Sequence, residues 1–345
     1  MIKSNKQFIT GAEVIVQACH DAGAKMMYGY PITPSSEILE NWQKTKGKCL
    51  QTEDEIAAGF AVAGGALAGE KVFSATSGPG HILMQDAMVM AEAMRIPMVL
   101  IVAQRGGPSS GTVIYSQQEV TLACYGGNGE GFRLVYSPAS LEELYTLARR
   151  AFNEAWQYRL PAVVLTDGYA LKAQGIFTKP KIQKKNIGAK SLFGTAEPVH
   201  VPNIFATEEE LNTKLKEIQG DYCKAKSKVE TYYEVGLKEA EVLVIAHGTV
   251  GASAEAAVLK LRKENKKVGL FRPVTLRPFP SARLNKVVST KKWKKIVIIE
   301  SSYGQLARLV HDELKVKNLP EILYLQKPGL GIEPEEIEDY IKKIK

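Results

Sequence analysis

A short segment near the start of the 345-residue sequence presents a hydroxyl group on a stiff backbone. Tyr30 and Pro31 open this segment, and Pro31 and Pro34 flank Thr33. Because proline restricts its own backbone and that of the preceding residue, the Thr33 hydroxyl would be held in one direction. That rigidity favours recognition of a polar substrate group. By composition alone, a strand end followed by a helix cap explains the same residues.

A second segment places three acidic residues, 53–55, at the predicted start of a helix. Acidic side chains there complement the helix dipole, which is their ordinary explanation. Glu55 differs because the residues that follow it, 57–66, are nearly all small, so a flat ligand or another backbone can approach closely. A carboxyl group in such a setting would be desolvated and would hold a proton near neutral pH.

A third segment begins at Arg105, directly after the apolar stretch 98–103 and at the start of a Gly/Ser-rich loop. A guanidinium group there can bind a carboxylate or phosphate through two hydrogen bonds, although it could equally tether the long loop. The turn at Ser77 and Gly78 resembles an anion-binding loop. It lacks the spacing of a dinucleotide or P-loop motif, so we predict a tight turn that lines a site.

The elements that must position these segments follow from the apolar pattern. Strands are predicted at 25–30, 72–76, 98–103, 134–135 and 162–165, alternating with helices at 12–22, 35–42, 54–68, 82–94 and 141–158. This alternation predicts a doubly wound α/β domain with a parallel sheet. In such sheets ligands bind at the carboxyl ends of the strands, where the three segments are expected to meet.

The second half of the chain predicts a smaller α/β domain. Residues 179–190 are basic and aperiodic, as in an extended arm, and 208–230 predict a charged helix. Beyond residue 241 strands are predicted at 242–246, 268–271, 296–300 and 322–324, and helices at 252–264, 305–314 and 334–344. We therefore expect domains at 1–175 and 239–345, joined by a linker with a charged helix at 176–238.

Composition excludes several classes of protein. Hydrophobic residues at 45% and charged residues at 24% are typical of a globular protein. No apolar run reaches the roughly 18 residues of a membrane span. The polar N-terminus lacks a secretory signal, so a cytoplasmic location without membrane partners is predicted. Cys19, Cys49, Cys124 and Cys223 form no CxxC pair, which argues against a zinc or iron–sulfur site, and we expect no metal in this chain.

Charge is divided unevenly along the chain. Residues 1–170 contain 13 basic and 16 acidic residues, a net charge of −3. Residues 171–345 contain 32 and 21, a net charge of +11. Because no nucleic-acid-binding motif accompanies the lysines, we expect a solvated basic surface and no nucleic-acid partner.

Taken together, the segments 30–38, 53–58, 75–80 and 104–109 resemble the alpha subunit of 2-oxoacid:ferredoxin oxidoreductases in order and spacing. The second half, at 270–280 and 297–305, is similar to that family's transketolase C-terminal-like domain. The resemblance covers nearly the whole chain. It implies a thiamine diphosphate-binding pyrimidine domain followed by the smaller C-terminal domain.

The resemblance also implies an activity and partners. Such enzymes decarboxylate a 2-oxoacid with thiamine diphosphate, reduce ferredoxin and transfer the acyl group to coenzyme A. The alpha chain supplies the pyrimidine half of the cofactor site. A beta subunit would supply the magnesium ion, the diphosphate half and a 4Fe-4S cluster, and separate gamma and delta subunits are possible. The dispersed cysteines agree with that division.

Residue roles follow from position in the family motifs. Glu55 corresponds to the glutamate that hydrogen-bonds the aminopyrimidine ring and stabilises its imino tautomer, which removes the thiazolium C2 proton. Arg105 corresponds to the arginine that pairs with the substrate carboxylate, and Thr33 to the threonine that bonds the substrate's polar groups. The predicted catalytic residues are thus Glu55, Arg105 and Thr33, and the predicted cofactor-binding residues are Glu55, Tyr30, Pro31, Ser77 and Gly78.

One position departs from the family pattern and leaves alternatives open. Asn128 stands where many relatives carry histidine, and an amide cannot titrate near pH 7. This residue could mark a different substrate. One alternative is a thiamine-dependent chain of the 2-oxoacid dehydrogenase E1 beta or split transketolase type. Another, which only Asn128 favours, is a non-catalytic paralogue.

Overall fold

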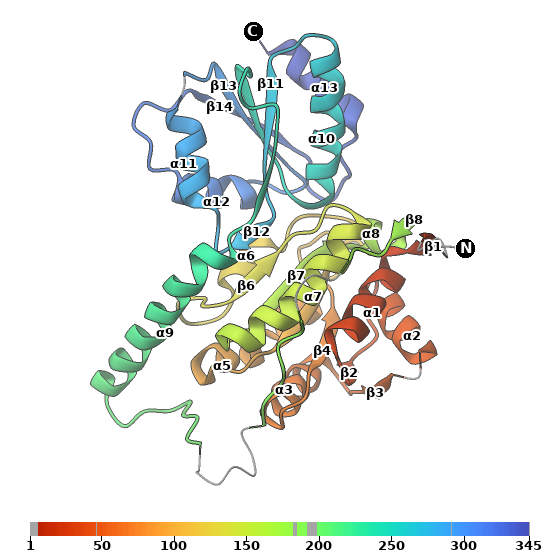
Figure 1. Ribbon diagram of the computed structural model, residues 1–345, viewed down its shortest axis with the longest axis vertical. Helices are drawn as coiled ribbons and strands as arrows, with labels where there is room; N and C mark the ends of the chain where they lie inside the picture. The colour runs from red at the N-terminus through yellow and green to blue at the C-terminus, as the bar shows by residue number, and fades with distance from the viewer. Residues whose placement is uncertain (1–5, 46, 182–184, 192–198, 291, 345) are drawn as a thin grey trace.

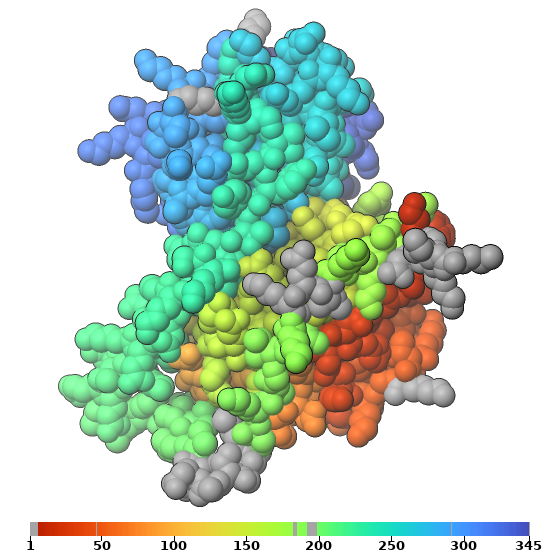
Figure 2. All heavy atoms as spheres, in the orientation of Figure 1, coloured from red at the N-terminus to blue at the C-terminus, as the bar shows by residue number. Residues whose placement is uncertain are grey.

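The computed structural model describes residues 6–45, 47–181, 185–191, 199–290 and 292–344. Figure 1 shows two lobes, an N-terminal one in red to yellow-green and a C-terminal one in cyan to blue. Figure 2 shows the same division in space-filling form, with the green helix α9 protruding from the N-terminal lobe.

The N-terminal lobe is built on a seven-stranded sheet in the order β12-β6-β7-β5-β4-β2-β3, in which every pair except β12–β6 is parallel. Its strands are β2 (Met26–Gly29), β3 (Lys48–Gln51), β4 (Val72–Thr76), β5 (Val99–Gln104), β6 (Leu134–Tyr136), β7 (Ala162–Asp167) and β12 (Thr275–Arg277). Every residue of β4, β5 and β7 is buried, because helices cover both faces of the sheet. The doubly wound α/β architecture predicted from the sequence is confirmed.

Helices divide between the two faces of this sheet. One face packs against α1 (Gly11–Ala22), α2 (Ser36–Lys44) and α7 (Leu141–Tyr158). The other packs against α3 (Glu55–Leu67), α4 (Pro79–Leu83), α5 (Gln85–Met94) and α6 (Val120–Tyr125). Alternate residues of β5 enter the two cores, with Ile101 on the α1 side and Leu100 on the α3 side.

The C-terminal lobe contains a five-stranded sheet in the order β14-β13-β10-β11-β9, parallel except for β9. Its elements are β9 (Tyr232–Val235), β10 (Val242–Ile245), α10 (Gly248–Lys263), β11 (Val268–Pro273), α11 (Ser281–Ser289), β13 (Lys295–Glu300), α12 (Gln305–Glu313), β14 (Glu321–Gln326) and α13 (Pro334–Lys343). The lobes are linked by α9 (Glu208–Val229), which packs on α7. A small antiparallel pair, β1 (Lys6–Thr10) with β8 (Gln174–Thr178), and the short helix α8 (Gly168–Lys172) complete the fold.

The structure corrects several element predictions. The helix expected at 82–94 is two helices, α4 and α5, that meet at Met84. The first starts at Pro79, because proline suits the first position of a helix and Gly78 supplies the positive φ before it. The apolar pattern also did not predict the short elements β1, β3, α6, α8, β8, β9, β12 and α11.

Two of the missed strands bear on how the halves are connected. β12 joins the edge of the N-terminal sheet, although its sequence lies in the second half of the chain, and β9 belongs to the C-terminal sheet. The segments 179–181 and 185–190 have no regular structure, as an extended arm would, while residues 182–184 lie outside the described part of the chain. The domain boundaries at 175 and 238 stay predictions.

Candidate active site

The acidic triplet at the start of α3 divides its roles between three side chains. Asp54 is the N-cap, and its Oδ1 accepts a hydrogen bond from the backbone N–H of Ala57 at 2.8 Å. Glu53 is exposed to solvent. Glu55, the first residue of the helix, is only 4% exposed. The helix-cap explanation therefore applies to Asp54 and leaves the burial of Glu55 without a capping role.

The Glu55 carboxyl lies against the backbone of Gly80. A Cβ built on Gly80 would lie 2.2 Å from Glu55 Oε1 and 2.3 Å from Thr76 Oγ1, so only glycine leaves room for this approach. Within the described part of the chain, no other side chain donates a hydrogen bond to the carboxyl. Burial raises the pKa of Glu55, with a smaller contribution from Asp54, while Arg105 opposes the shift. Glu55 is thus a buried carboxyl group prepared to hold or share a proton.

Two buried hydroxyl groups lie at the end of β4 and in the turn that follows it. Thr76 Oγ1 and Ser77 Oγ are both buried and have no hydrogen-bond partner among the described residues. Gly78 has a φ of 48°, which a side chain would adopt only with strain. A buried polar atom without a partner is rare in a folded protein and indicates a ligand or bound solvent.

Arg105 joins this turn to the segment that carries Thr33. The Arg105 Nη1 donates a hydrogen bond to the carbonyl oxygen of Thr33 at 2.8 Å. Its aliphatic stem lies beside Gly78, because a Cβ on Gly78 would come within 3.3 Å of Arg105 Cγ. Arg105 Nε is buried and has no partner among the described residues. The structure therefore brings Arg105, Thr33 and Gly78 together and leaves donor capacity on the guanidinium.

The other predicted residues lie at the margin of this arrangement. Tyr30 and Pro31 are exposed where the chain leaves β2, and Thr33 is exposed with a hydroxyl that bonds to no described residue. Asn128 is exposed in the turn between α6 and β6. Nothing in the described part of the chain joins Asn128 to Glu55, Arg105 or Thr33. Its suggested role in substrate choice stays a prediction.

Sequence reasoning missed one acidic residue beside the site, Glu119. It is 5% exposed and accepts hydrogen bonds from the backbone N–H groups of Gly78 and Arg105. In the sequence it is a single glutamate at the end of a polar loop, directly before α6. No spacing or motif distinguishes it, because its partners come from segments far apart in the chain.

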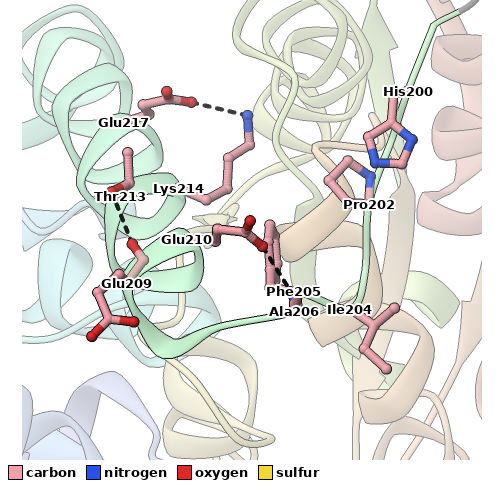
Figure 3. A pocket seen from close by; sticks show the side chains of 10 residues that line it. All are labelled: His200, Pro202, Ile204, Phe205, Ala206, Glu209, Glu210, Thr213, Lys214 and Glu217. Atoms are coloured by element: carbon pink, nitrogen blue, oxygen red, sulfur yellow. Dashed lines mark hydrogen bonds and ion pairs between the residues drawn. The ribbon is translucent and has the colours of Figure 1, made fainter.

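A large hollow of the chain lies elsewhere. It measures about 570 Å³, lies between the segment 200–206 and α9, and contains none of the predicted site residues (Figure 3). Three of its charged groups have local partners: Glu210 accepts from the backbone N–H of Ala206, and Lys214 pairs with Glu217. We place the candidate site at Glu55 and Arg105, where buried polar atoms lack partners, and not in this hollow.

The residues around Glu55 fit one half of a site for a flat, polar cofactor. They offer a carboxyl group to which no other described side chain donates, a glycine backbone beside it and two unsatisfied hydroxyl groups. Among the described residues, no group of three or more His, Cys, Asp and Glu side chains is placed to hold a metal ion. No described helix has the length and apolar character needed to span a membrane.

Comparison with known proteins places this geometry in a family. Residues 17–239 match the family described as pyruvate flavodoxin/ferredoxin oxidoreductase, thiamine diphosphate-binding. Residues 240–337 match the pyruvate:ferredoxin oxidoreductase core domain II. The chain belongs to the pyruvate flavodoxin/ferredoxin oxidoreductase family. The resemblance recognised from the four sequence segments is confirmed.

Curated relatives support the same assignment. The 2-oxoglutarate synthase subunit KorA of Methanocaldococcus jannaschii is 31% identical, over 96% of this chain and 98% of the relative. The ketoisovalerate oxidoreductase subunit VorB of Methanothermobacter thermautotrophicus is 32% identical, over 89% of this chain and 87% of the relative. The family member described here is accordingly a 2-oxoacid:ferredoxin oxidoreductase subunit of the alpha type.

Solved structures agree with the fold. The 2-oxoglutarate:ferredoxin oxidoreductase from Magnetococcus marinus aligns with a TM-score of 0.87 at 25% identity, over 99% of this chain and 66% of the longer one. That structure has 2-oxoglutarate, coenzyme A and succinyl-CoA bound. A split-gene transketolase, an inactive beta4 tetramer, aligns with a TM-score of 0.60 at 13% identity, which shows a shared fold alone.

Proposed function

We propose that this chain works with a beta subunit to convert a 2-oxoacid, coenzyme A and two oxidised ferredoxins into acyl-CoA, CO2, two reduced ferredoxins and a proton. The carbon–carbon bond to the carboxylate breaks, and its electron pair passes to ferredoxin in two single-electron steps. The acyl carbon forms a thioester with the coenzyme A sulfur. The beta subunit would hold the magnesium ion and the 4Fe-4S cluster, and gamma and delta subunits are possible further partners.

The observation that carries this proposal is the buried Glu55 carboxyl beside Gly80. Thiamine diphosphate, when bound, supplies a carbon nucleophile for the 2-oxo group and accepts the electrons released with CO2. Glu55 would hold a proton at its carboxyl oxygen and share it with the aminopyrimidine ring. Ser77 and Gly78, with Tyr30 and Pro31, would line the cofactor, because the Ser77 hydroxyl is buried without a partner.

Arg105 and Thr33 would bind the substrate. Arg105 already donates one N–H to the Thr33 carbonyl, and its unpartnered Nε remains for the substrate carboxylate. Thr33 would donate its hydroxyl to the 2-oxo oxygen. A charge-assisted bond to a carboxylate fixes the acid and so aims its 2-oxo carbon at the cofactor.

The beta subunit would cover the apolar face beside Glu55. On α3, Ile56 and Phe60 are one helical turn apart and are 41% and 38% exposed. On the adjoining α4, Ile82 and Leu83 are 54% and 42% exposed. Exposed apolar side chains gathered in this way are typical of a protein interface. Covering them would close the cofactor site from the side that this chain leaves open.

The test is coexpression with a beta subunit of the same family, followed by assay of the purified complex. Coenzyme A-dependent ferredoxin reduction is measured on pyruvate, 2-ketoisovalerate, 2-oxoglutarate and an aryl pyruvate. We expect turnover on one of these acids and a roughly 100-fold or greater loss of kcat in Glu55→Gln. Glu53→Gln, an exposed neighbour at the same helix start, is the matched control and should keep wild-type turnover.

The outcomes separate the alternatives. A cofactor-loaded complex that reduces a lipoyl domain but not ferredoxin would assign the chain to the dehydrogenase type. A stable complex without turnover on any acid would favour the non-catalytic paralogue. For the interface, Ile82→Asp should weaken beta-chain capture, whereas Ile204→Asp, on the segment before α9, should not. Equal capture by both variants would contradict the proposed face.

A further inference from the structure

Glu119 ties together two segments that carry predicted site residues. One carboxylate oxygen, Oε1, accepts hydrogen bonds from the backbone N–H of Gly78 at 3.0 Å and of Arg105 at 3.1 Å. The other oxygen, Oε2, lies 2.8 Å from Nδ1 of His81, which is fully buried. A single buried carboxylate therefore makes contacts with the turn after β4, the start of the loop after β5, and α4.

Hydrogen bonds hold together the two ends of the loop 105–119. The backbone N–H of Glu119 donates to Gln104 Oε1 at 3.3 Å, and the N–H of Gly107 donates to Gln118 Oε1 at 3.2 Å. Residues 105 and 119 are thus held side by side. This arrangement resembles an Ω-loop, whose ends lie close together and whose residues often carry function.

We propose that Glu119 is a positioning residue that sets Arg105 for binding the 2-oxoacid carboxylate, an inference that rests on the proposed function. It acts on Arg105 from two sides. It holds the Arg105 backbone directly, and it holds the Gly78 turn against which the arginine stem lies. With both fixed, the guanidinium reaches the Thr33 carbonyl and keeps its Nε toward the site.

The anchoring oxygen is suited to this task because it accepts from both backbone N–H groups. Hydrogen bonds from backbone N–H groups to a carboxylate are stronger than those to a neutral acceptor, and few competing waters reach this buried group. Loss of the charge would leave the same shape with weaker bonds. Loss of this oxygen would leave the Gly78 and Arg105 N–H groups without their acceptor, so both segments would shift.

The test compares Glu119→Gln and Glu119→Leu in the alpha–beta complex, each alone and combined with Arg105→Ala. We expect the KM for the 2-oxoacid to rise roughly tenfold in Glu119→Gln. In Glu119→Leu, kcat/KM should fall on the order of 100-fold. In the Arg105→Ala background Glu119→Gln should have less than about a threefold further effect, because a residue that acts through Arg105 is not additive with its loss.

Two further readouts separate positioning from general loosening. The apparent affinity for thiamine diphosphate should be unchanged in Glu119→Gln. In Glu119→Leu, hydrogen exchange should rise in the peptides that contain Gly78 and Arg105. Glu130→Gln, an exposed acidic neighbour, is the control for both.

Additive effects of Glu119→Gln and Arg105→Ala, or an unchanged KM in Glu119→Gln, would overturn the inference. The proposed function would still stand if Arg105→Ala alone lowered turnover. A complex whose turnover does not depend on Arg105 would overturn both.

Discussion

Glu55 occupies a position where an ionised carboxyl costs stability. Its carboxyl is buried and bonds to no other side chain among the described residues, and burial raises its pKa. A carboxyl whose pKa is raised in the folded state binds more protons folded than unfolded. The free energy of unfolding therefore falls as the pH rises through the unfolded and then the folded pKa. At neutral pH the buried Glu55 carboxyl therefore lowers the free energy of unfolding.

Glu55→Gln should remove that cost together with the activity. We expect the variant to be at least as resistant to urea at pH 8 as the wild type, because the amide has no charge to desolvate. Unfolding midpoints of the purified chain at pH 5 and pH 8 measure this, with Glu53→Gln as the exposed control. A variant less stable than the wild type at pH 8 would show that the carboxylate is satisfied in the fold.

Gly80 is the residue whose lack of a side chain most directly shapes the site. In Gly80→Ala the new methyl group would overlap both Glu55 Oε1 and Thr76 Oγ1. Thr76 lies on a buried strand and cannot move, so the flexible Glu55 side chain should be displaced. We expect the free energy of unfolding to fall by about 1–3 kcal/mol. Turnover should fall by a much larger fraction of its wild-type value than stability does.

The matched control for Gly80→Ala lies on α3 itself. A methyl group at Gly64 meets nothing within 4 Å, so Gly64→Ala should stabilise the helix by roughly 1 kcal/mol and leave turnover unchanged. Urea unfolding and ferredoxin reduction distinguish the two variants. Equal turnover in both would mean that Glu55 does not depend on the space at Gly80.

At the residue scale the local run of small residues after Glu55 predicted a desolvated carboxyl, and the structure buries Glu55. The room beside the carboxyl comes from Gly80 of α4 and not from that run. Glu119 could not be predicted in this way. Its three partners lie 14, 38 and 41 positions away, so only the folded chain brings them to one carboxylate.

At the scale of elements, length and burial decided what the sequence could predict. Long helices such as α7 and fully buried strands such as β5 have periodic or continuous apolar patterns, and both were predicted. The three-residue strand β12 has no such pattern. It pairs with β6, about 140 positions earlier in the chain, and such a pairing leaves no local mark in the sequence.

The loop 105–119 is an element without regular structure that both lobes hold in place. Gln117, which is 1% exposed, donates from Nε2 to the carbonyl of His247 at 2.8 Å and accepts from the N–H of Ser301 at 3.2 Å. Ser301 directly follows β13, and His247 lies two residues beyond the end of β10, so both partners belong to the C-terminal sheet's strand ends. The C-terminal lobe thereby fixes the loop that begins at Arg105 and ends at Glu119.

Gln117→Ala should loosen the loop and weaken the contact between the lobes. It leaves the Ser301 N–H buried without a partner, while the His247 carbonyl keeps the bond from the Gly251 N–H, so the cost is about 1–3 kcal/mol. We expect a matching drop in the free energy of unfolding and a higher KM for the 2-oxoacid. Gln157→Ala, at an exposed position on α7, is the control. Wild-type values for Gln117→Ala would show that the loop holds its shape without the C-terminal lobe.

At the scale of the whole molecule, the lobes meet through buried titratable groups. His247 Nδ1 lies 2.8 Å from Ser137 Oγ of the N-terminal lobe. Thr249, on α10, donates its hydroxyl to Asp167 at the end of β7 at 2.6 Å. Burial lowers the pKa of His247 to about 3, with Arg272 adding to the shift, and raises the pKa of Asp167 to about 6. Burial at this interface therefore favours the neutral form of His247.

These two shifts act on stability in opposite directions. The unfolded chain protonates His247 below its ordinary value of 6.5, whereas the folded chain does so only near pH 3. Stability from His247 is thus present above pH 6.5 and is lost as the pH falls toward 3. Asp167 binds its proton earlier in the folded chain, so its effect favours the folded state below its ordinary value of 3.8 and is lost as the pH rises to about 6.

His247→Asn isolates the histidine term, because asparagine keeps a polar atom near Ser137 but does not titrate. We expect the variant to be less stable than the wild type at pH 8 and to lose less stability on acidification. Between pH 6.5 and 4.5 the slopes should differ by up to about 1.4 kcal/mol per pH unit. Urea unfolding across that range measures the slopes, and His311→Asn, at an exposed position on α12, should follow the wild type. A buried neutral histidine must contribute to the loss of stability on acidification. If His247→Asn and the wild type had the same slope, His247 would not be the source, and the acid sensitivity would arise away from this interface.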